Sequence, residues 1–200
     1  MTNPGKPEWV AARTSCFSRR RQAMDAAKYA ATERLRNGAS LQIRALLPSD
    51  RTEMLASIGR ASKETLYRRF FAPKRGFSER EIEFFLNVDF ISHVALAAVL
   101  SEGGRQVIVG GARYIVSQPG CAEVAFAIDD PHQKLGIATY LISHLIEIAR
   151  AAGLEEFVAE VLPENVPMLK VFERCGLVMT TRRERGVVHV KLALSRGAMT

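Results

Sequence analysis

A strand that leads through a short loop into an amphipathic helix is the feature that most constrains the fold of this chain. Glu123–Ile128 is an apolar run with one carboxylate, which is typical of a buried strand. Asp129-Asp130-Pro131 interrupts this run, and from about Leu135 apolar residues recur at helical spacing until Gly153 ends the helix. Such a junction gathers unpaired N–H groups and the positive end of a helix dipole at one place, which suits a phosphate. The segment therefore predicts an α/β fold with an anion-binding loop.

The loop at this junction has the spacing Gln-x-x-Gly-x-Ala, formed by Gln133, Gly136 and Ala138. This is not the Gly-x-Gly-x-x-Gly fingerprint of dinucleotide-binding proteins, and it lacks the Gly-Lys-Ser/Thr ending of a nucleotide P-loop. Small residues at Gly136 and Ala138 would let the backbone approach a ligand closely. An ordinary helix start is the alternative interpretation of the same residues.

The remaining patterns predict a single domain at residues 39–200, preceded by a basic extension at 1–38 that is helical or partly disordered, with a helix at 25–36. Ser78-Glu79-Arg80-Glu81 is a capping box and gives the clearest helix start. The strands at 123–128 and 157–161 are joined by a helical crossover, so we expect them to be parallel. The predicted elements of the domain are a strand at 41–45, helices at 48–60 and 63–71, a helix beginning at Ser78, strands at 94–100, 107–116 and 123–128, the helix from about 135, a strand at 157–161, a helix at 163–175, and a hairpin of 177–182 and 187–194.

The positive charge of the chain is concentrated near its N-terminus. Residues 1–38 carry eight Lys/Arg and three Asp/Glu, a net +5, whereas the rest carries twenty against eighteen, a net +2. The body is thus nearly balanced, and we do not expect it to bind nucleic acid. No apolar run approaches the roughly 18 residues of a membrane span. The cysteines and histidines show neither a disulfide framework nor metal-ligand spacing, so we expect a cytoplasmic protein without a metal site.

The order of elements and the loop spacing resemble the GCN5-related N-acetyltransferase (GNAT) superfamily from residue 41 to about 194. In that superfamily, (Gln/Arg)-x-x-Gly-x-(Gly/Ala) binds the pyrophosphate of acetyl-CoA. Four stretches are similar to the acetyltransferase domain of bacterial protein lysine acetyltransferases (Pat-like) that modify acyl-CoA synthetases. These stretches are Glu64–Phe71, Val88–Leu96, Ala122–Phe126 and Glu164–Met168. The resemblance implies a GNAT fold, an α/β (α+β) arrangement whose mixed central β-sheet has splayed parallel strands and flanking helices.

The resemblance also implies a route for acetyl-CoA. Its extended pantetheine arm would insert between the strands at 123–128 and 157–161, in a form of β-augmentation. Backbone groups of Phe126, Ala127 and Ile128 would face this arm and the thioester carbonyl. Asn165 would bond the arm or cap the following helix, and Met168 would lie beside it. The implied pyrophosphate loop consists of Gln133, Lys134, Leu135, Gly136, Ile137, Ala138 and Thr139, acting mainly through backbone N–H groups.

Glu123 is the predicted general base. A lysine ammonium with a pKa near 10.4 is not nucleophilic, so acyl transfer needs a group that removes its proton. In the resembling family the glutamate of this Ala-Glu-(Val/Ile)-Ala strand has that role, and partial desolvation would raise the pKa of such a carboxyl. The alternative interpretation is that Glu123 is an ordinary strand glutamate that faces solvent and has no catalytic role. Glu160 is the other candidate, because other branches of the superfamily use a glutamate there together with a tyrosine acid, whose place Phe172 takes here.

The resemblance therefore implies an acetyl-CoA-dependent N-acetyltransferase that works by direct attack in a ternary complex with a glutamate base. The preferred acceptor is a protein lysine, possibly on an acyl-CoA synthetase. A small amine or a polyamine is the alternative acceptor, and a non-catalytic acyl-CoA sensor is the alternative outside the enzymes. We expect a monomer or homodimer that does not associate with membranes.

Overall fold

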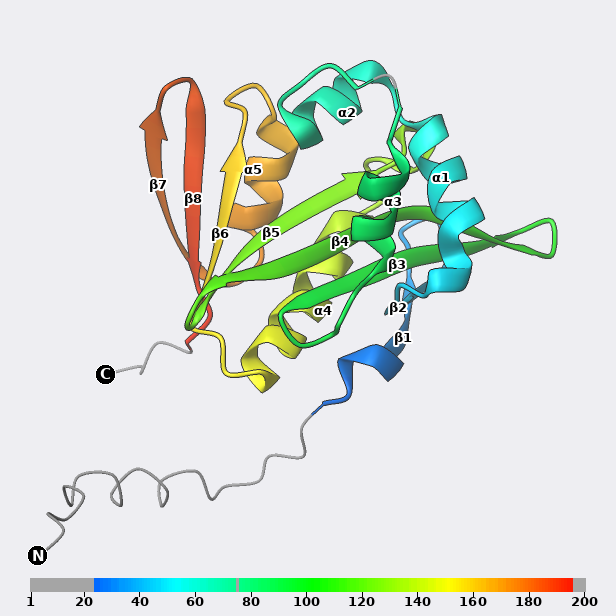
Figure 1. The fold of residues 1–200 in the computed structure, drawn as a ribbon, viewed down its shortest axis with the longest axis horizontal. Helices are drawn as coiled ribbons and strands as arrows, with labels where there is room; N and C mark the ends of the chain where they lie inside the picture. The colour runs from blue at the N-terminus through cyan, green and yellow to red at the C-terminus, as the bar shows by residue number, and fades with distance from the viewer. Residues whose placement is uncertain (1–23, 75, 196–200) are drawn as a thin grey trace, which may run out of the picture.

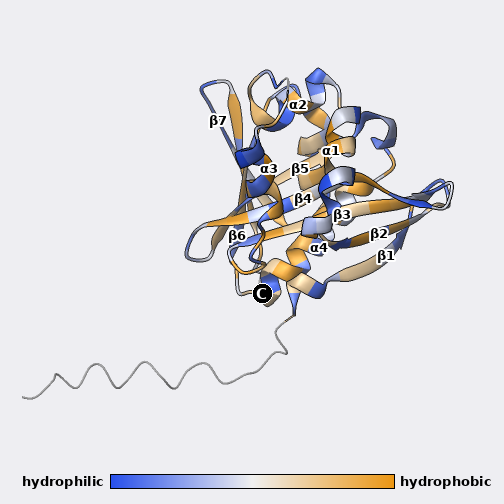
Figure 2. Ribbon diagram, turned by 45° about the vertical axis from the view of Figure 1, so that its right-hand side comes forward, coloured by the Kyte–Doolittle hydropathy of each residue, from blue (hydrophilic) through white to orange (hydrophobic). Residues whose placement is uncertain are grey.

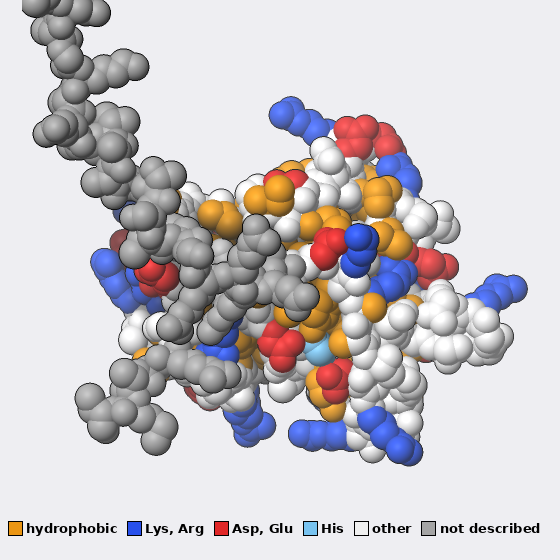
Figure 3. All heavy atoms as spheres, turned by 90° about the horizontal axis from the view of Figure 1, so that it is seen from below, with side chains coloured by type: hydrophobic (Ala, Val, Ile, Leu, Met, Phe, Trp, Pro, Cys, Tyr) orange, Lys and Arg blue, Asp and Glu red, His pale blue; other side chains and the backbone are white. Residues whose placement is uncertain are grey.

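The computed structural model describes residues 24–74 and 76–195 (Figure 1). Most of the predicted basic extension, including Arg19-Arg20-Arg21, lies outside the described residues. No helix within the described ranges is long and apolar enough to cross a membrane. On the face seen in Figure 3, Lys and Arg side chains are interspersed with Asp and Glu and do not form one basic patch.

An eight-stranded sheet forms the centre of the molecule, with the order β1-β2-β3-β4-β5-β6-β8-β7. Adjacent strands of this sheet are antiparallel, except for β5 and β6. These two strands are parallel, as predicted from the helical crossover between them. The mixed sheet confirms the predicted fold class. The strands are β1 (Ala30–Arg34), β2 (Ser40–Ala45), β3 (His93–Glu102), β4 (Arg105–Gln118), β5 (Cys121–Ile128), β6 (Glu156–Val161), β7 (Val178–Glu184) and β8 (Val187–Ala193).

Helices cover both faces of this sheet (Figure 1). α1 (Arg51–Arg60), α2 (Lys63–Phe70) and α3 (Glu79–Leu86) lie on one face, and α4 (Ile137–Ala151) lies on the other, with α5 (Val166–Glu173) beside β6. Three short 3₁₀ turns complete the order within the described residues: η2 (Ala26–Lys28), η3 (Pro48–Asp50) and η4 (Asp130–His132). Hydrophobic residues are concentrated where the helices meet the sheet (Figure 2).

The apolar run of β3 reflects burial of this strand on both faces of the sheet. Val94, Leu96, Ala98 and Leu100 pack in the cluster that contains α4, whereas Ala95, Ala97 and Val99 pack with α1 and α3. Because successive side chains of a strand point to opposite faces, a strand covered by helices on both sides must be apolar at every position. The unbroken apolar pattern at 94–100 follows from this double burial.

The start of α3 confirms the predicted capping box. The Ser78 hydroxyl accepts the N–H of Glu81 at 3.3 Å, and the Glu81 carboxylate accepts the N–H of Ser78 at 2.9 Å. These reciprocal bonds satisfy two N–H groups that would otherwise lack acceptors. Ile82 is buried, and Phe77 packs against the same cluster, as a hydrophobic staple requires.

The helix predicted at 25–36 is wrong. The short turn η2 is followed by β1, which pairs with β2 in antiparallel register from Ala30–Arg44 to Arg34–Ser40. The alanines of this segment favour a helix locally, but the free edge of β2 supplies hydrogen-bond partners that an isolated helix would not have. The sheet thus begins inside the segment assigned to the extension, and the predicted boundary at residues 38/39 falls between two paired strands.

β5 and β6 separate along their length, as predicted. Their parallel register includes only the pairs Cys121–Glu156, Ala122–Phe157 and Glu123–Val158. Beyond Glu123, β5 remains paired only with β4, and β6 only with β8. Figure 1 shows the two strands close together at one end and spread apart at the other. This opening leaves backbone N–H and C=O groups available on one edge of each strand, and it positions the site.

Candidate active site

A cavity of about 290 Å³ lies where β5 and β6 separate, between α2, the start of α4 and the start of α5. Most of the predicted cofactor-binding residues come together here. Of the remaining two, Leu135 packs against the main hydrophobic core, and Ala127 lines a smaller neighbouring cavity. The predicted residues that line the larger cavity are Phe126, Ile128, Gln133, Lys134, Gly136, Ile137, Ala138, Thr139, Asn165 and Met168.

The loop into α4 has the backbone that an anion site needs. Gly136 is the N-cap residue with φ 90°, and Lys134 also adopts a left-handed conformation, with φ 64°. The first hydrogen bonds at this helix end are those of Thr139 and Tyr140, whose N–H groups donate to the Gly136 carbonyl at 3.0 and 3.3 Å. The N–H groups at the beginning of a helix have no intrahelical acceptor, and the residues at this positive end of the helix dipole, Gly136 to Thr139, line the cavity.

Three arginines that the sequence analysis did not single out also line this cavity: Arg36, Arg68 and Arg69. Arg68 forms an ion pair with Glu64, yet its Nε is buried without any hydrogen-bond acceptor among the described residues. A buried donor without an acceptor costs free energy, so this nitrogen suits an anionic ligand. Arg68 and Arg69 belong to the Glu64–Phe71 stretch that carried the family resemblance. That stretch was the sequence feature from which these two arginines could have been predicted as cavity residues. Arg36 was hidden by the incorrect helix at 25–36.

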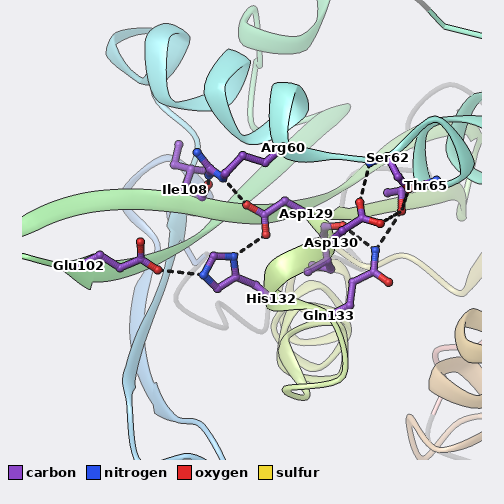
Figure 4. A network of polar contacts seen from close by, with 10 residues as sticks. Arg60, Ser62, Thr65, Glu102, Ile108, Asp129, Asp130, His132 and Gln133 are labelled. Carbon is purple, nitrogen blue, oxygen red and sulfur yellow. Dashed lines mark hydrogen bonds and ion pairs between the residues drawn. The ribbon is translucent and has the colours of Figure 1, made fainter.

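A network of charged groups holds the loop against the sheet (Figure 4). The buried carboxylate of Asp129 accepts hydrogen bonds from Nε of Arg60 at 2.7 Å and from Nδ1 of His132 at 2.6 Å. Arg60 also donates to the Ile108 carbonyl at 2.6 Å, and the other ring nitrogen of His132 lies 2.9 Å from Glu102. The end of β5 is thereby fixed to α1 and to the β3–β4 hairpin.

A second set of contacts ties the same loop to α2 (Figure 4). Asp130 accepts the N–H of Ser62 at 2.6 Å and the hydroxyl of Thr65 at 3.3 Å. Burial alone would raise the pKa of Asp130, but these hydrogen bonds outweigh it and hold the pKa below its usual value. The amide of Gln133 donates to Thr65 at 3.0 Å and to the Ile128 carbonyl at 3.2 Å. The Gln133 side chain therefore positions the loop.

Both candidate bases line one further cavity, of about 220 Å³. Glu123 is the last residue of β5 that pairs with β6, so it stands where the strands separate. Its side chain is exposed, contrary to the expected partial desolvation. Glu160, on β6, is also exposed and lies 3.4 Å from His189. Phe172 is buried and packs edge-to-face against Phe126 in the same wall.

Asn165 caps α5, as one of its two predicted roles requires. Its side-chain oxygen accepts the N–H of Met168 at 3.3 Å. Pro167 follows in the first turn, where a missing N–H costs nothing. The predicted contact of Asn165 with a pantetheine arm stays a prediction, although its side chain lines both the larger cavity and the one that holds the glutamates.

Comparison with known proteins gives consistent results. The model of the "Acetyltransferase (GNAT) family" matches residues 63–177. The chain is 33% identical over 156 residues to "Acetyltransferase Pat" of Mycolicibacterium smegmatis, covering 77% of this chain and 46% of that protein. It is 31% identical over 125 residues to "Acetyltransferase PA5475" of Pseudomonas aeruginosa, covering 62% and 67%.

A solved structure agrees with these relatives. The crystal structure of the GNAT domain of S. lividans PAT superposes with a TM-score of 0.75 at 34% identity, over 82% of this chain and 96% of that one. Against the full-length M. smegmatis relative, in contrast, this chain spans about half the length of the protein.

Proposed function

Because this chain belongs to the acetyltransferase (GNAT) family, we propose that it transfers the acetyl group of acetyl-CoA to the ε-amine of a lysine side chain in another protein. The observation that carries this proposal is the junction of two cavities at the point where β5 and β6 separate. One contains the start of α4 with its free N–H groups, and the other contains Glu123 and Glu160. In this proposal, the cofactor site and the acid–base site meet where the pairing of β5 with β6 ends, at Glu123.

The residues present fit the parts of acetyl-CoA. Its pyrophosphate would accept hydrogen bonds from the N–H groups at the start of α4, with Arg36, Arg68 and Lys134 supplying positive charge. The unsatisfied Nε of Arg68 would gain an acceptor. The pantetheine arm carries amide groups, which match the free edge of β5 beyond Glu123. The thioester would then lie near Phe126, which lines both cavities.

Glu123 acts as the base in this proposal. The acceptor ammonium would enter the cavity of about 220 Å³ and lose a proton to the Glu123 carboxylate. The neutral amine then attacks the thioester carbonyl, an amide C–N bond forms, the C–S bond breaks, and the CoA thiolate leaves, while the second proton of the nitrogen passes to the departed thiolate or to solvent. The hydrocarbon ring of Phe172 lines this cavity at the place where other branches carry a tyrosine acid. A thiol with a pKa near 8.5 can leave as the thiolate, so the reaction does not require that acid.

Glu160 remains the alternative base. It lines the same cavity but lies on β6, beside His189. Glu123 is favoured because it stands on β5, the strand that leads directly into that loop. A water bridge could serve either exposed carboxylate in taking up the amine proton.

The acceptor can be identified directly. Purified protein is incubated with acetyl-CoA labelled in the acetyl group and a matched cell lysate, and Glu123→Gln and Gly136→Glu variants are treated in parallel. We expect label on lysines of one or a few proteins, possibly an acyl-CoA synthetase, with the wild type only. Label confined to small molecules would establish a small-amine or polyamine acceptor. Binding of acetyl-CoA without any transfer would indicate a sensor and contradict the proposal. The cytoplasmic location and the monomer or homodimer stay predictions.

A further inference from the structure

Two arginines, Arg69 and Arg113, line a third cavity on the side of the sheet covered by α1, α2 and α3. This cavity has a volume of about 100 Å³. Its other walls are largely apolar and include Met54, Ile58, Phe70, Phe85 and Ile108. An apolar cavity of this size, large enough for several atoms of a ligand, does not need two cations for its own packing.

Neither guanidinium has a carboxylate partner within residues 24–74 and 76–195. Arg113 contacts only neutral groups: its Nη1 lies 3.0 Å from Nε2 of His93 and 3.4 Å from the Phe85 carbonyl, and its guanidinium stacks 4.8 Å from the Phe85 ring. Arg69 stacks 4.9 Å from the Phe70 ring. Elsewhere in the described chain, partly buried arginines such as Arg44 and Arg60 pair with an aspartate.

The surroundings disfavour the two charges. Burial and, second, the charge of Arg69 lower the pKa of Arg113 to about 10. Burial also lowers the pKa of Arg69, and the negative charge of Glu123 opposes that shift. A guanidinium group in a protein is effectively always charged, so two like charges lie in partly desolvated surroundings. Charges in such surroundings are costly unless they are paired and hydrogen-bonded, and an anion in the cavity would relieve that cost.

The cavity adjoins the place where the acyl group would react. Arg69 and Phe126 line all three cavities, so the Arg69–Arg113 cavity is continuous in its walls with both the cofactor cavity and the glutamate cavity. An acetyl group ends in an uncharged methyl, which cannot pair with either guanidinium. A longer acyl chain or an acceptor that carried a carboxylate would use both, because guanidinium groups bind carboxylates through paired, charge-assisted hydrogen bonds.

We propose that Arg69 and Arg113 form a binding site for a carboxylate that is carried to the thioester by one of the two reactants. The carboxylate would stand at the end of a short dicarboxylic acyl chain, as in succinyl-CoA, or on a small amine acceptor, as in free lysine. This inference rests on the proposed function, because it places the carboxylate relative to the proposed cofactor cavity.

The test compares ligands that differ only in this carboxylate, by calorimetry on the full chain. In the first arm, succinyl-CoA is compared with butyryl-CoA, which has the same chain length without the charge. In the second, free lysine is compared with cadaverine in the presence of saturating CoA. We expect the carboxylate-bearing member of at least one pair to bind about tenfold or more tightly, the gain expected of a charge-assisted hydrogen bond. The arm that shows the gain identifies the reactant.

The variant Arg113→Gln tests whether this cavity causes the preference, because Arg113 lines the third cavity and neither of the other two. It should abolish the preference for the carboxylate while acetyl-CoA affinity stays at the wild-type value. Arg113→Lys keeps the charge without the planar fork and should retain only part of the preference. If Arg113→Gln does not fold, the wild-type comparison still decides.

Equal binding within both wild-type pairs would overturn this proposal, whereas the proposed function is decided separately by whether the acetyl label is transferred to protein lysines in the lysate experiment. A wild type that binds none of the CoA compounds would overturn both.

Discussion

The Asp129 carboxylate, directly after β5, lies 2.7 Å from Nε of Arg60, the last residue of α1. The aspartate side chain is fully buried, whereas that of Arg60 is 32% exposed. The contact joins two segments that are 69 residues apart. It fixes the start of the loop that would bind the pyrophosphate to α1, and so adds to the contacts of Asp130 and Gln133 that hold the same loop against α2.

Replacing Asp129 should therefore be costly. In Asp129→Asn, the Arg60 guanidinium and the His132 ring lose their charged, buried acceptor, and removing one partner of a buried pair typically costs about 3 kcal/mol or more. Urea denaturation gives the free energy of unfolding. The control is Glu79→Gln, which removes the exposed Arg51–Glu79 pair at 2.6 Å and should cost less than about 1 kcal/mol. Similar losses in the two variants would show that the Asp129 network does not stabilise the fold.

Acetyl-CoA binding should depend on Gly136. A glutamate there would put a negative charge and a side chain at the start of α4, where the pyrophosphate is expected, and so abolish binding. Gly153→Glu is a matched control at the other end of α4: both glycines have positive φ, 90° and 80°, and a Cβ at either would meet nothing within 4 Å. The two variants should lose similar stability in thermal denaturation. Calorimetry should show binding only in Gly153→Glu, and unchanged affinity in Gly136→Glu would disprove the loop assignment.

Glu123→Gln should lower turnover by about 10²–10⁴-fold, the usual contribution of general-base catalysis, with acetyl-CoA affinity unchanged. The deficit should shrink as pH rises, because more of the acceptor amine then arrives already deprotonated. Glu160→Gln is the matched control in the same cavity and should cost far less. Rates are measured with the acceptor that the lysate experiment identifies. If Glu160→Gln loses most of its turnover while Glu123→Gln stays active, then Glu160 and not Glu123 is the general base.

The two ends of the predicted extension should differ in importance. Deleting residues 1–23 should leave the melting temperature and the turnover nearly unchanged. Deleting residues 1–34 also removes β1, whose five residues pair with β2, and the Tyr29 and Glu33 side chains that contact His144 of α4. The longer deletion should therefore lower the melting temperature by several degrees. A large loss after the shorter deletion would mean that its residues dock on the domain or recruit the acceptor.

Asp89, in the segment before β3, should stabilise the fold at neutral pH and lose this contribution at acidic pH. Burial on its own would raise the pKa of Asp89, but hydrogen bonds from the Ser92 hydroxyl and from the N–H groups of Ile91, Ser92 and His93 outweigh it and lower the pKa to about 2. A lowered pKa contributes stability above the unfolded value of about 4, and this contribution is lost as pH falls toward 2. Asp89→Asn should thus melt below the wild type at pH 7, and the difference should vanish between about pH 4 and pH 2. A gap that persists at pH 2 would contradict this origin.

Features that depend on neighbouring residues could be predicted from the sequence. The capping box at Ser78, the parallel strands around the α4 crossover, the separation of β5 and β6 and most of the cavity-lining loop residues were predicted, because each depends on local spacing or on a family motif. The roles of Glu123 and Glu160 stay predictions, although the structure brings both into one cavity.

What the sequence by itself determined is which segments become strands, helices and turns wherever the local pattern and the tertiary environment agree. Only the tertiary structure decided that Ala30–Arg34 is an edge strand, because the free hydrogen-bonding edge of β2 outweighs the helix preference of alanine. It also decided that Arg60 reaches Asp129 and that Arg69 and Arg113 line one cavity. These contacts join residues that are 44 to 69 positions apart, and charge pairing or desolvation between such residues arises only after the sheet has brought them together.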